Sequence, residues 1–288
     1  MKNFLWTLVG IGFGIFSVAD ERPNILLILS DDHSVPHLGA YECPNCLQYD
    51  LTPNLDAFAK EGIRFDRAYT TAPQCAPSRV SIFAGRSPIG IGATRFGQPA
   101  ANDTVLFTDL LRDSGYWVGL DGRHQHLDGR IKDLPHVSEE LVNQGVRGPE
   151  FEARFDHFVR GVSTKGENLP KVGAIFSSVL DMVPGDKPFF IYFGFNQPHR
   201  KFDPDHEEIN PDELVLPEDW PDIPEVRKDY AKFLSEVRDL DNGFGQVMSV
   251  LNERGLKDDT LVVFMGDNGD AMLRGKGSLY RRGLHVPL

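Results

Sequence analysis

Two pairs of polar residues in this 288-residue chain have the chemistry of metal ligands. Asp31 and Asp32 follow one long apolar segment, and Asp267 and Asn268 follow another near the end of the chain. Carboxylate and amide oxygens form an all-oxygen ligand set, which suits Ca²⁺ or Mg²⁺ better than a metal that prefers sulfur. The alternative is that both pairs are solvated turn residues, because Asp-Asn-Gly is a common turn sequence.

The three cysteines are a second source of chemistry, and in an exported protein their odd number leaves at least one without a partner. Cys43 and Cys46 share a Cys-x-x-Cys motif, whereas Cys75 begins the sequence Cys-Ala-Pro-Ser-Arg at residues 75–79. We expect the Cys-x-x-Cys motif to hold a disulfide or two free thiols. No further zinc ligands accompany it, and we do not expect it to open a helix after a strand, as thioredoxin-like motifs do.

The apolar segments that precede the polar residues are typical of buried strands. Continuous apolar runs predict strands at residues 24–30, 117–120, 189–195 and 260–265, with residues 63–68 as a fifth candidate. A short helix is predicted between the N-cap Thr52 and the stop residue Gly62. Further helices are predicted at residues 78–84, 104–112, 171–182 and 226–254. Gly243 and Gly245 are candidate kinks in the longest of them.

Strands that alternate with helices indicate the α/β fold class, with a mostly parallel central sheet and helices on both faces. Ligands of such sheets bind beyond the carboxyl ends of the strands. The polar residues that follow predicted strands are Asp31, Asp32, His124, His126, His199, Asp267 and Asn268. We therefore expect one pocket to collect them.

Composition limits the class of protein. Hydrophobic residues make up 41% of the chain and charged residues 25%, which is typical of a globular domain and excludes a disordered chain or a multi-span membrane protein. The length allows one large α/β domain or two small ones and excludes a disulfide-stapled miniprotein. The 42 acidic residues outnumber the 30 basic ones and give a net charge of -12, which disfavours nucleic acid as a partner.

The N-terminus predicts export, to the periplasm or out of the cell. Lys2 precedes an apolar run at residues 4–16, and small residues up to Ala19 suit a signal peptidase. We expect residues 1–19 to be a cleaved signal peptide and residues 20–288 to be the mature domain. The alternative is an uncleaved anchor, although the run is shorter than the roughly 20 residues that span a bilayer. No later segment is long and apolar enough to span, so we expect no stable membrane insertion.

The motif at residues 75–79 resembles the signature of the sulfatase family, Cys-x-Pro-Ser-Arg followed by a helix and by Ala84-Gly85. Other landmarks of that family occur in the expected order. They are Pro-Asn-Ile-Leu-Leu-Ile-Leu-Ser-Asp-Asp at residues 23–32, Thr-Pro-Asn-Leu-Asp at 52–56, Pro198-His199, Asp267-Asn268-Gly269 and Gly-Lys-Gly-Ser-Leu-Tyr at 275–280. The resemblance extends from Pro23 to Leu288.

The resemblance implies the fold of the alkaline-phosphatase superfamily, usually with a smaller C-terminal subdomain. We expect this chain to lack that subdomain and the last strands of the sheet, because it stops at Leu288. The resemblance also implies one Ca²⁺ per chain, with Mg²⁺ as the less favoured ion. The implied metal ligands are Asp31, Asp32, Cys75, Asp267 and Asn268. In the family a maturation enzyme converts the cysteine, here Cys75, to formylglycine, and the hydrated aldehyde attacks the ester sulfur.

The same resemblance assigns roles to further residues. Arg79 would hold the hydrated aldehyde, while Lys276 and His199 would bind sulfate oxygens and assist the leaving alkoxide. One block departs from the family pattern, since Gly-Arg-His-Gln-His-Leu-Asp-Gly at residues 122–129 stands where Gly-Lys-x-His-Leu-Gly is usual. Arg123 would replace the usual lysine and His126 the usual histidine, with His124 as the rival. Arginine cannot donate a proton near neutral pH, so we expect Arg123 to bind sulfate.

The implied function is hydrolysis of sulfate esters, N-sulfates included, in a sulfated small molecule or oligosaccharide. A cation, an arginine and a lysine create a positive pocket, so the acidic net charge does not argue against an anionic substrate. One alternative is a phosphonate or phosphate ester hydrolase of the same superfamily. Another, from a different class, is a catalytically inactive secreted carbohydrate-binding protein or a redox module at the Cys-x-x-Cys motif. We expect specificity residues in the loops at 89–101 and 201–224.

Overall fold

The computed structural model describes residues 22–123, 126–129, 139–140, 143–144, 146, 148–159, 161, 163–202 and 209–288. The signal peptide predicted at residues 1–19 and the rival histidine His124 lie outside these residues. Among the helices within them, none has the length and apolarity needed to cross a bilayer.

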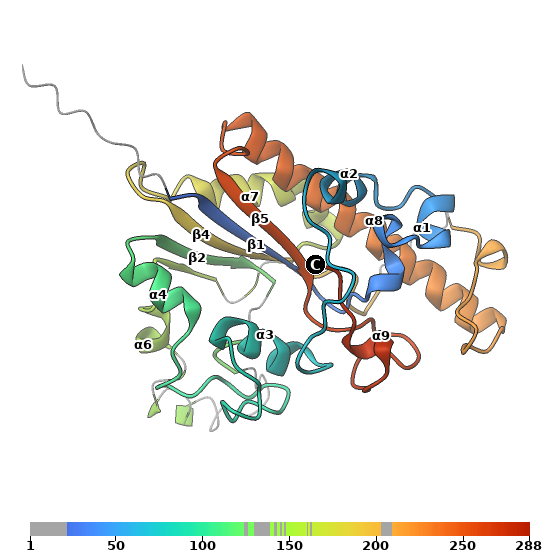
Figure 1. The fold of residues 1–288 in the computed structure, drawn as a ribbon, viewed down its shortest axis with the longest axis horizontal. Helices are drawn as coiled ribbons and strands as arrows, with labels where there is room; N and C mark the ends of the chain where they lie inside the picture. Colours follow the sequence, from blue (N-terminus) through green and yellow to red (C-terminus); the bar gives the residue numbers. More distant parts are fainter. Residues whose placement is uncertain are drawn as a thin grey trace, which may run out of the picture.

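In the part of the chain that the structure describes, five strands form one central sheet (Figure 1). They are β1 (Asn24–Ser30), β2 (Trp117–Gly122), β3 (His157–Phe158), β4 (Phe189–Gly194) and β5 (Thr260–Gly266). Their order across the sheet is β3-β2-β4-β1-β5. Every pairing between neighbouring strands is parallel. The predicted α/β class with a mostly parallel sheet is confirmed.

The inner strands are largely apolar because both of their faces are covered. In β1, Leu26 and Ile28 belong to one buried cluster, and Leu27 and Leu29 belong to another. Successive side chains of a strand point to opposite faces, so the two clusters are the two faces of the sheet. This double burial explains why the strand sequences show no polar alternation.

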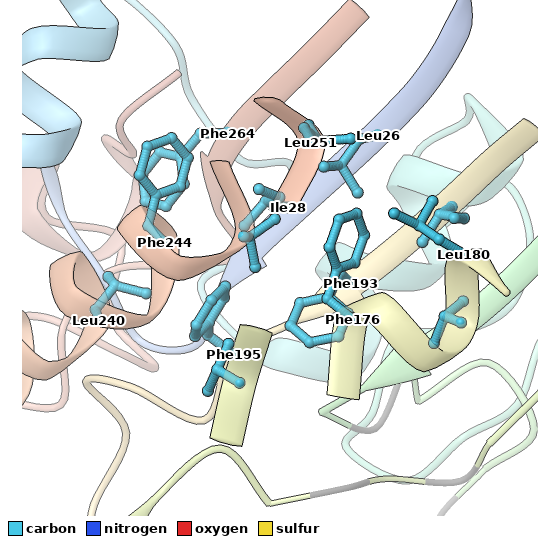
Figure 2. Close-up of a cluster of buried hydrophobic side chains, with 14 of the residues drawn as sticks. Leu26, Ile28, Phe176, Leu180, Phe193, Phe195, Leu240, Phe244, Leu251 and Phe264 are labelled. Carbon is cyan, nitrogen blue, oxygen red and sulfur yellow. The ribbon is translucent and has the colours of Figure 1, made fainter. Parts of the chain in front are cut away.

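Three helices cover the first face of the sheet. They are α2 (Pro53–Glu61), α7 (Val172–Leu180) and α8 (Pro224–Glu253). Phe176 of α7 and Phe244 of α8 point toward the strands, where they meet Ile28 and Phe193 (Figure 2). Each such buried side chain contributes about 1.5–3 kcal/mol through burial of apolar surface.

The opposite face carries α3 (Cys75–Ala84), α4 (Phe107–Asp113) and α6 (Pro149–Glu152). Phe83 of α3 stacks on Phe107 of α4 with 5.2 Å between ring centroids, and Phe107 packs edge-on against Phe190 of β4. Figure 1 shows α3, α4 and α6 on one side of the sheet and α7 and α8 on the other. The prediction of helices on both faces is therefore confirmed.

Short elements connect these layers. They are the helices α1 (Pro44–Gln48) and α9 (Arg281–Leu284) and the 3-10 helices Val35–His37, Gly39–Tyr41, Gly166–Lys171 and Pro211–Glu213.

The strand predicted at residues 63–68 is not present. This segment forms backbone hydrogen bonds with the last residues of the chain, such as that from Phe65 N to Leu288 O at 2.8 Å. One isolated antiparallel β-bridge joins the nearby Tyr69 to His285. Ile63 is 82% exposed and Phe65 is 51% exposed, so the apolar pattern that predicted a buried strand does not correspond to burial here.

The long helix also differs from expectation, because α8 continues through Gly243 and Gly245 as one element. A side-chain carbon at Gly243 would lie 2.5 Å from the ring of Phe195. This glycine therefore serves close packing between the helix and the end of β4 rather than a kink.

The Cys-x-x-Cys motif opens the short helix α1 but does not follow a strand, in agreement with our expectation. Cys43 is the N-cap of α1, and its Sγ accepts a hydrogen bond from the backbone N of Cys46 at 3.2 Å. The preceding element is a 3-10 helix and not a strand, so the thioredoxin-like arrangement is absent at this motif. Both cysteines are buried free thiols, one of the two states that we expected.

Candidate active site

The carboxyl ends of β1 and β5 bring the two pairs of polar residues together. These strands pair in register up to Ser30 and Gly266, so the residues that follow are neighbours. Oδ1 of Asp267 accepts hydrogen bonds from the backbone N of Asp32 at 2.9 Å and of Asn268 at 2.7 Å. Nδ2 of Asn268 donates to Oδ1 of Asp32 at 2.9 Å. The four residues form one buried cluster.

Cys75 approaches this cluster from the other side. It is the first residue of α3, and its Sγ lies 3.2 Å from Oδ1 of Asp31 and 3.6 Å from Oδ1 of Asp32. The helix begins three residues earlier than predicted. Pro77 is compatible with that start because the first helical turn has no intrahelical partner for its backbone N.

Arg79 lies one turn into α3 and is fully buried. Its Nε donates to Oδ2 of Asp267 at 2.8 Å, and one terminal nitrogen lies 3.7 Å from Oδ2 of Asp31. Burial alone would raise the pKa of Asp31, but Arg79 and Arg123 beside it hold that pKa well below its usual value. Asp31 is therefore a stable carboxylate at the centre of the site.

Lys276 reaches the same point from the loop after β5. Its Nζ lies 2.6 Å from Oδ1 of Asp32 and 3.0 Å from Sγ of Cys75. Burial would lower the pKa of Lys276, but Cys75, Asp32 and the other carboxylates raise it above its usual value. The side chain is therefore a fixed positive charge next to the cysteine.

His199 follows β4, and its side chain is partly exposed at the site. Its Nε2 lies 3.6 Å from Oδ2 of Asp32, and its Nδ1 contacts the carbonyl oxygen of Arg200. Both ring nitrogens thus lie near oxygen atoms, a carboxylate oxygen of Asp32 and the carbonyl oxygen of Arg200.

The altered block at residues 122–129 places Arg123 in the site. Its Nε donates to Oδ2 of Asp31 at 2.8 Å. His126 is buried on the turn that follows, where its ring centroid lies 5.5 Å from that of Phe96. The structure thus brings together Asp31, Asp32, Cys75, Arg79, Arg123, His199, Asp267, Asn268 and Lys276, whereas the place of His126 in the chemistry stays a prediction.

Sequence reasoning missed a second group of residues that hold the site in place. Asp270 binds Ser34 and Nε2 of His37, the latter at 2.9 Å, and so ties the loop after β1 to the loop after β5. Its backbone oxygen also accepts from the backbone N of Lys276 at 2.7 Å. The one signal in the sequence was an aspartate directly after the Asp-Asn-Gly motif.

Lys165 holds the loop after β4. Its Nζ donates to the backbone oxygen of His199 at 2.6 Å and lies 2.8 Å from Oε2 of Glu236, a buried residue of α8. No motif in the sequence pointed to this lysine, because its partners His199 and Glu236 lie far from it in the chain.

The cluster fits a hard divalent cation. Ligand atoms of Asp31, Asp32, Cys75 and His199 all lie within 4.8 Å of one another. Oδ1 of Asn268 is buried, and within the described part of the chain no donor reaches it. A buried amide oxygen without a donor is costly, and coordination of a cation would satisfy it. Burial raises the pKa of Asp267 to about 6. Arg79 acts to lower this pKa, whereas the neighbouring carboxylates Asp31 and Asp32 raise it further, as expected where carboxylates crowd together.

Cys75 thus stands at a helix N-terminus and faces a carboxylate cluster at the carboxyl edge of a parallel sheet. The family model for sulfatases matches residues 23–288, and the chain belongs to the sulfatase family. Human N-sulphoglucosamine sulphohydrolase is 28% identical to the chain over 309 aligned residues, which cover 95% of the chain and 56% of the relative. The chain thus spans little more than half the length of that relative.

Solved structures share the fold. The structure of Ps i-CgsB in complex with k-i-k-neocarrahexaose has a TM-score of 0.66 at 24% identity, over 92% of this chain and 65% of that one. The phosphonate monoester hydrolase SpPMH from Silicibacter pomeroyi has a TM-score of 0.69 at 18% identity, over 92% of this chain and 67% of that one. The alkaline-phosphatase-like fold expected from the sequence is therefore confirmed.

Proposed function

We propose that this protein is a sulfuric ester hydrolase whose nucleophile is a formylglycine made from Cys75 by a maturation enzyme. The observation that carries the proposal is the position of Cys75, at a helix N-terminus and within 3.6 Å of Asp31, Asp32 and Lys276. The partial positive charge of that helix end and the nearby ammonium group both favour an oxyanion at this point.

The unmodified thiol is a poor candidate for the nucleophile. Burial, together with Asp31, Asp267 and Asp32, raises the pKa of Cys75 well above its usual value, although Lys276 acts against them. Reactive cysteines have a lowered pKa, because the thiolate is the attacking species. A hydrated aldehyde at this position avoids that difficulty.

The proposed reaction uses the two hydroxyl groups of the hydrated aldehyde in turn. One hydroxyl releases its proton to water and its oxygen forms a bond to the ester sulfur while the bond between sulfur and the leaving oxygen breaks, and the leaving oxygen takes a proton from His199. The second hydroxyl then releases its proton, and the carbon–oxygen bond to sulfate breaks as the aldehyde forms again. Water restores the hydrate. Cysteine or serine lacks the second hydroxyl and could not release sulfate in this way.

The other side chains bind and orient. Arg79 holds the hydrated aldehyde. The guanidinium is itself oriented by Asp267, whose Oδ2 accepts a hydrogen bond from Nε of Arg79 at 2.8 Å. Lys276 and Arg123 bind sulfate oxygens, and Arg123 does so with a planar group suited to oxyanions. His126 is proposed to lie close to the nucleophile, as the resemblance implies.

Calcium is the proposed cofactor, held by Asp31, Asp32, Asp267, Asn268 and the modified Cys75. A bound Ca²⁺ would lower the pKa of the attacking hydroxyl and offset charge on the sulfate. The fit rests on the oxygen-rich ligand set and on the buried Oδ1 of Asn268.

The proposed substrate is a sulfated carbohydrate. The human relative's name specifies an N-sulfated glucosamine, which supports O- or N-sulfated sugars as the class. We further propose that residues 1–19 direct export and that residues 20–288 form the catalytic part, which would act in the periplasm or outside the cell.

The test compares two model esters on the calcium-loaded protein. We expect turnover of an aryl sulfate that is lost in Cys75→Ala, with an unchanged circular dichroism spectrum. A second candidate function, hydrolysis of phosphonate esters, is supported by the shared fold with SpPMH. A large preference for an aryl phosphonate over the aryl sulfate would contradict the proposal and favour that candidate. Absence of turnover on both esters in protein that carries formylglycine would favour the non-catalytic alternative.

A further inference from the structure

Tyr192 is a buried polar residue of β4 that the proposed mechanism does not use. It lies on the face of the sheet that α3 covers, and it is fully enclosed. Its hydroxyl accepts a hydrogen bond from a terminal nitrogen of Arg79 and donates one to the backbone oxygen of Arg123 at 3.3 Å. One phenol group therefore touches both arginines of the site.

These contacts close a ring around Asp31. Arg123 reaches Oδ2 of Asp31 at 2.8 Å, and Arg79 reaches the same oxygen at 3.7 Å. Tyr192 joins the side chain of Arg79 to the backbone of Arg123. The ring thereby links α3, the end of β2 and β4, three elements that are far apart in the sequence.

The packing around the hydroxyl is tight. A side-chain carbon at Gly194 would meet the Tyr192 hydroxyl and would lie 2.7 Å from the backbone oxygen of Arg123. Glycine at this position is what lets the tyrosine reach both partners. Burial raises the pKa of Tyr192 to about 12, so the hydroxyl keeps its proton and can donate throughout the neutral range.

We propose that Tyr192 is a positioning residue that fixes Arg79 and Arg123 relative to each other, and so sets the oxyanion site of the enzyme. This inference rests on the proposed function. The tyrosine does not touch the reacting atoms. Without its hydroxyl, a guanidinium N–H of Arg79 and the backbone oxygen of Arg123 lose a shared partner, and both arginines gain freedom.

Tyr192→Phe removes only the hydroxyl and tests the proposal. The matched control is Tyr116→Phe, because Tyr116 packs in the same apolar cluster and donates to the backbone oxygen of Pro23 at 3.0 Å, away from the site. Wild type and both variants are compared in calcium buffer for thermal midpoint, for affinity toward inorganic sulfate by calorimetry, and for kcat and KM on an aryl sulfate.

We expect Tyr192→Phe to lower kcat by about 10–100-fold and to weaken sulfate binding by about tenfold, as is typical when a supporting hydrogen bond is lost. Tyr116→Phe should leave both within about twofold, since it touches no site residue. A Tyr192→Phe variant that loses only thermal stability, with kcat and sulfate affinity unchanged, would overturn the proposal.

The sulfate measurement separates this proposal from the proposed function. Wild-type protein that binds sulfate but turns over no sulfate ester would count against the proposed function, and the weaker binding of Tyr192→Phe would still support the positioning role. Wild-type protein that binds no sulfate would overturn the positioning role as well, because the arginines would then form no oxyanion site.

Discussion

Three cations, Arg79, Arg123 and Lys276, surround three carboxylates in the site. Each pair is buried or half-buried, so the loss of one partner leaves a charge without compensation in a region of low dielectric constant. The residues are therefore interdependent, and single substitutions should act mainly on the geometry and charge of the site.

The ammonium group of Lys276 gives a direct test at this scale. Lys276→Met should lower kcat for an aryl sulfate by about 10²–10³-fold, the usual loss when one donor to a developing oxyanion is removed. Lys257→Met is the matched control, because Lys257 pairs with Glu61 on the surface at 2.9 Å. Steady-state kinetics on both variants checks this, and equal kcat values for the two would refute the assigned role.

Residue identities in the site were largely predictable, and their contacts were not. Asp31 and Asp267 could be found because each follows a continuous apolar run, and Cys75 because of its five-residue motif. Tyr192 was not predicted, because in the sequence it is one aromatic residue within an otherwise apolar strand. Asp270 and Lys165 act through partners that lie more than thirty residues away, which no local pattern encodes.

At the scale of elements, α2 is held onto α8 by one carboxylate. Asp241 of α8 accepts hydrogen bonds from the backbone N of Asn54 at 3.1 Å and of Leu55 at 2.8 Å, in the first turn of α2. Burial raises the pKa of Asp241 to about 6, although these hydrogen bonds act against the shift. The folded state therefore binds a proton at this site more tightly than the unfolded state does.

This shift predicts a pH dependence of stability. The contribution of Asp241 to the free energy of unfolding is fully present below about pH 4 and is lost as the pH rises to about 6, by at most about 3 kcal/mol. Asp241→Asn has no titrating group there. Urea unfolding between pH 4 and pH 7 should show the wild type losing stability relative to the variant as the pH rises, and parallel curves would contradict the shift.

The inner strands were predictable because a strand buried on both faces must be apolar along its length. β3 was missed since two residues carry no periodicity. The prediction of a strand at residues 63–68 is wrong. The composition of this segment is strand-like, but a strand also needs a neighbouring strand to pair with, and composition does not reveal whether one is present. The start of α3 lies three residues before the predicted one, since Pro77 can occupy the first turn of a helix.

At the scale of the whole molecule, an acidic protein of net charge -12 carries a site in which two arginines and a lysine gather around the carboxylates. The charges that matter for an anionic substrate are the local ones, since salt screens the distant surface charges over roughly 8–10 Å. A cation in the carboxylate cluster would add to this local field and would link segments from both ends of the chain.

Calcium should therefore stabilise the whole fold. Calcium at 100 times its dissociation constant adds about 2.7 kcal/mol to the free energy of unfolding, and a chelator should reverse the gain. Asn268→Ala should reduce this calcium-dependent rise in thermal midpoint because it removes one ligand oxygen. Asn45→Ala is the control, since Asn45 is equally buried but binds Val215 instead. Scanning calorimetry with and without calcium checks both, and an unchanged midpoint in the wild type would contradict the metal site.

The central claim is that Cys75 becomes a formylglycine, and the mass of the tryptic peptide at residues 68–79 tests it most directly. Protein purified from its native host should yield this peptide at about 18 Da below the mass expected for cysteine, as conversion of the thiol to an aldehyde requires. A peptide found wholly at the unmodified mass, in protein that still hydrolyses sulfate esters, would contradict the claim.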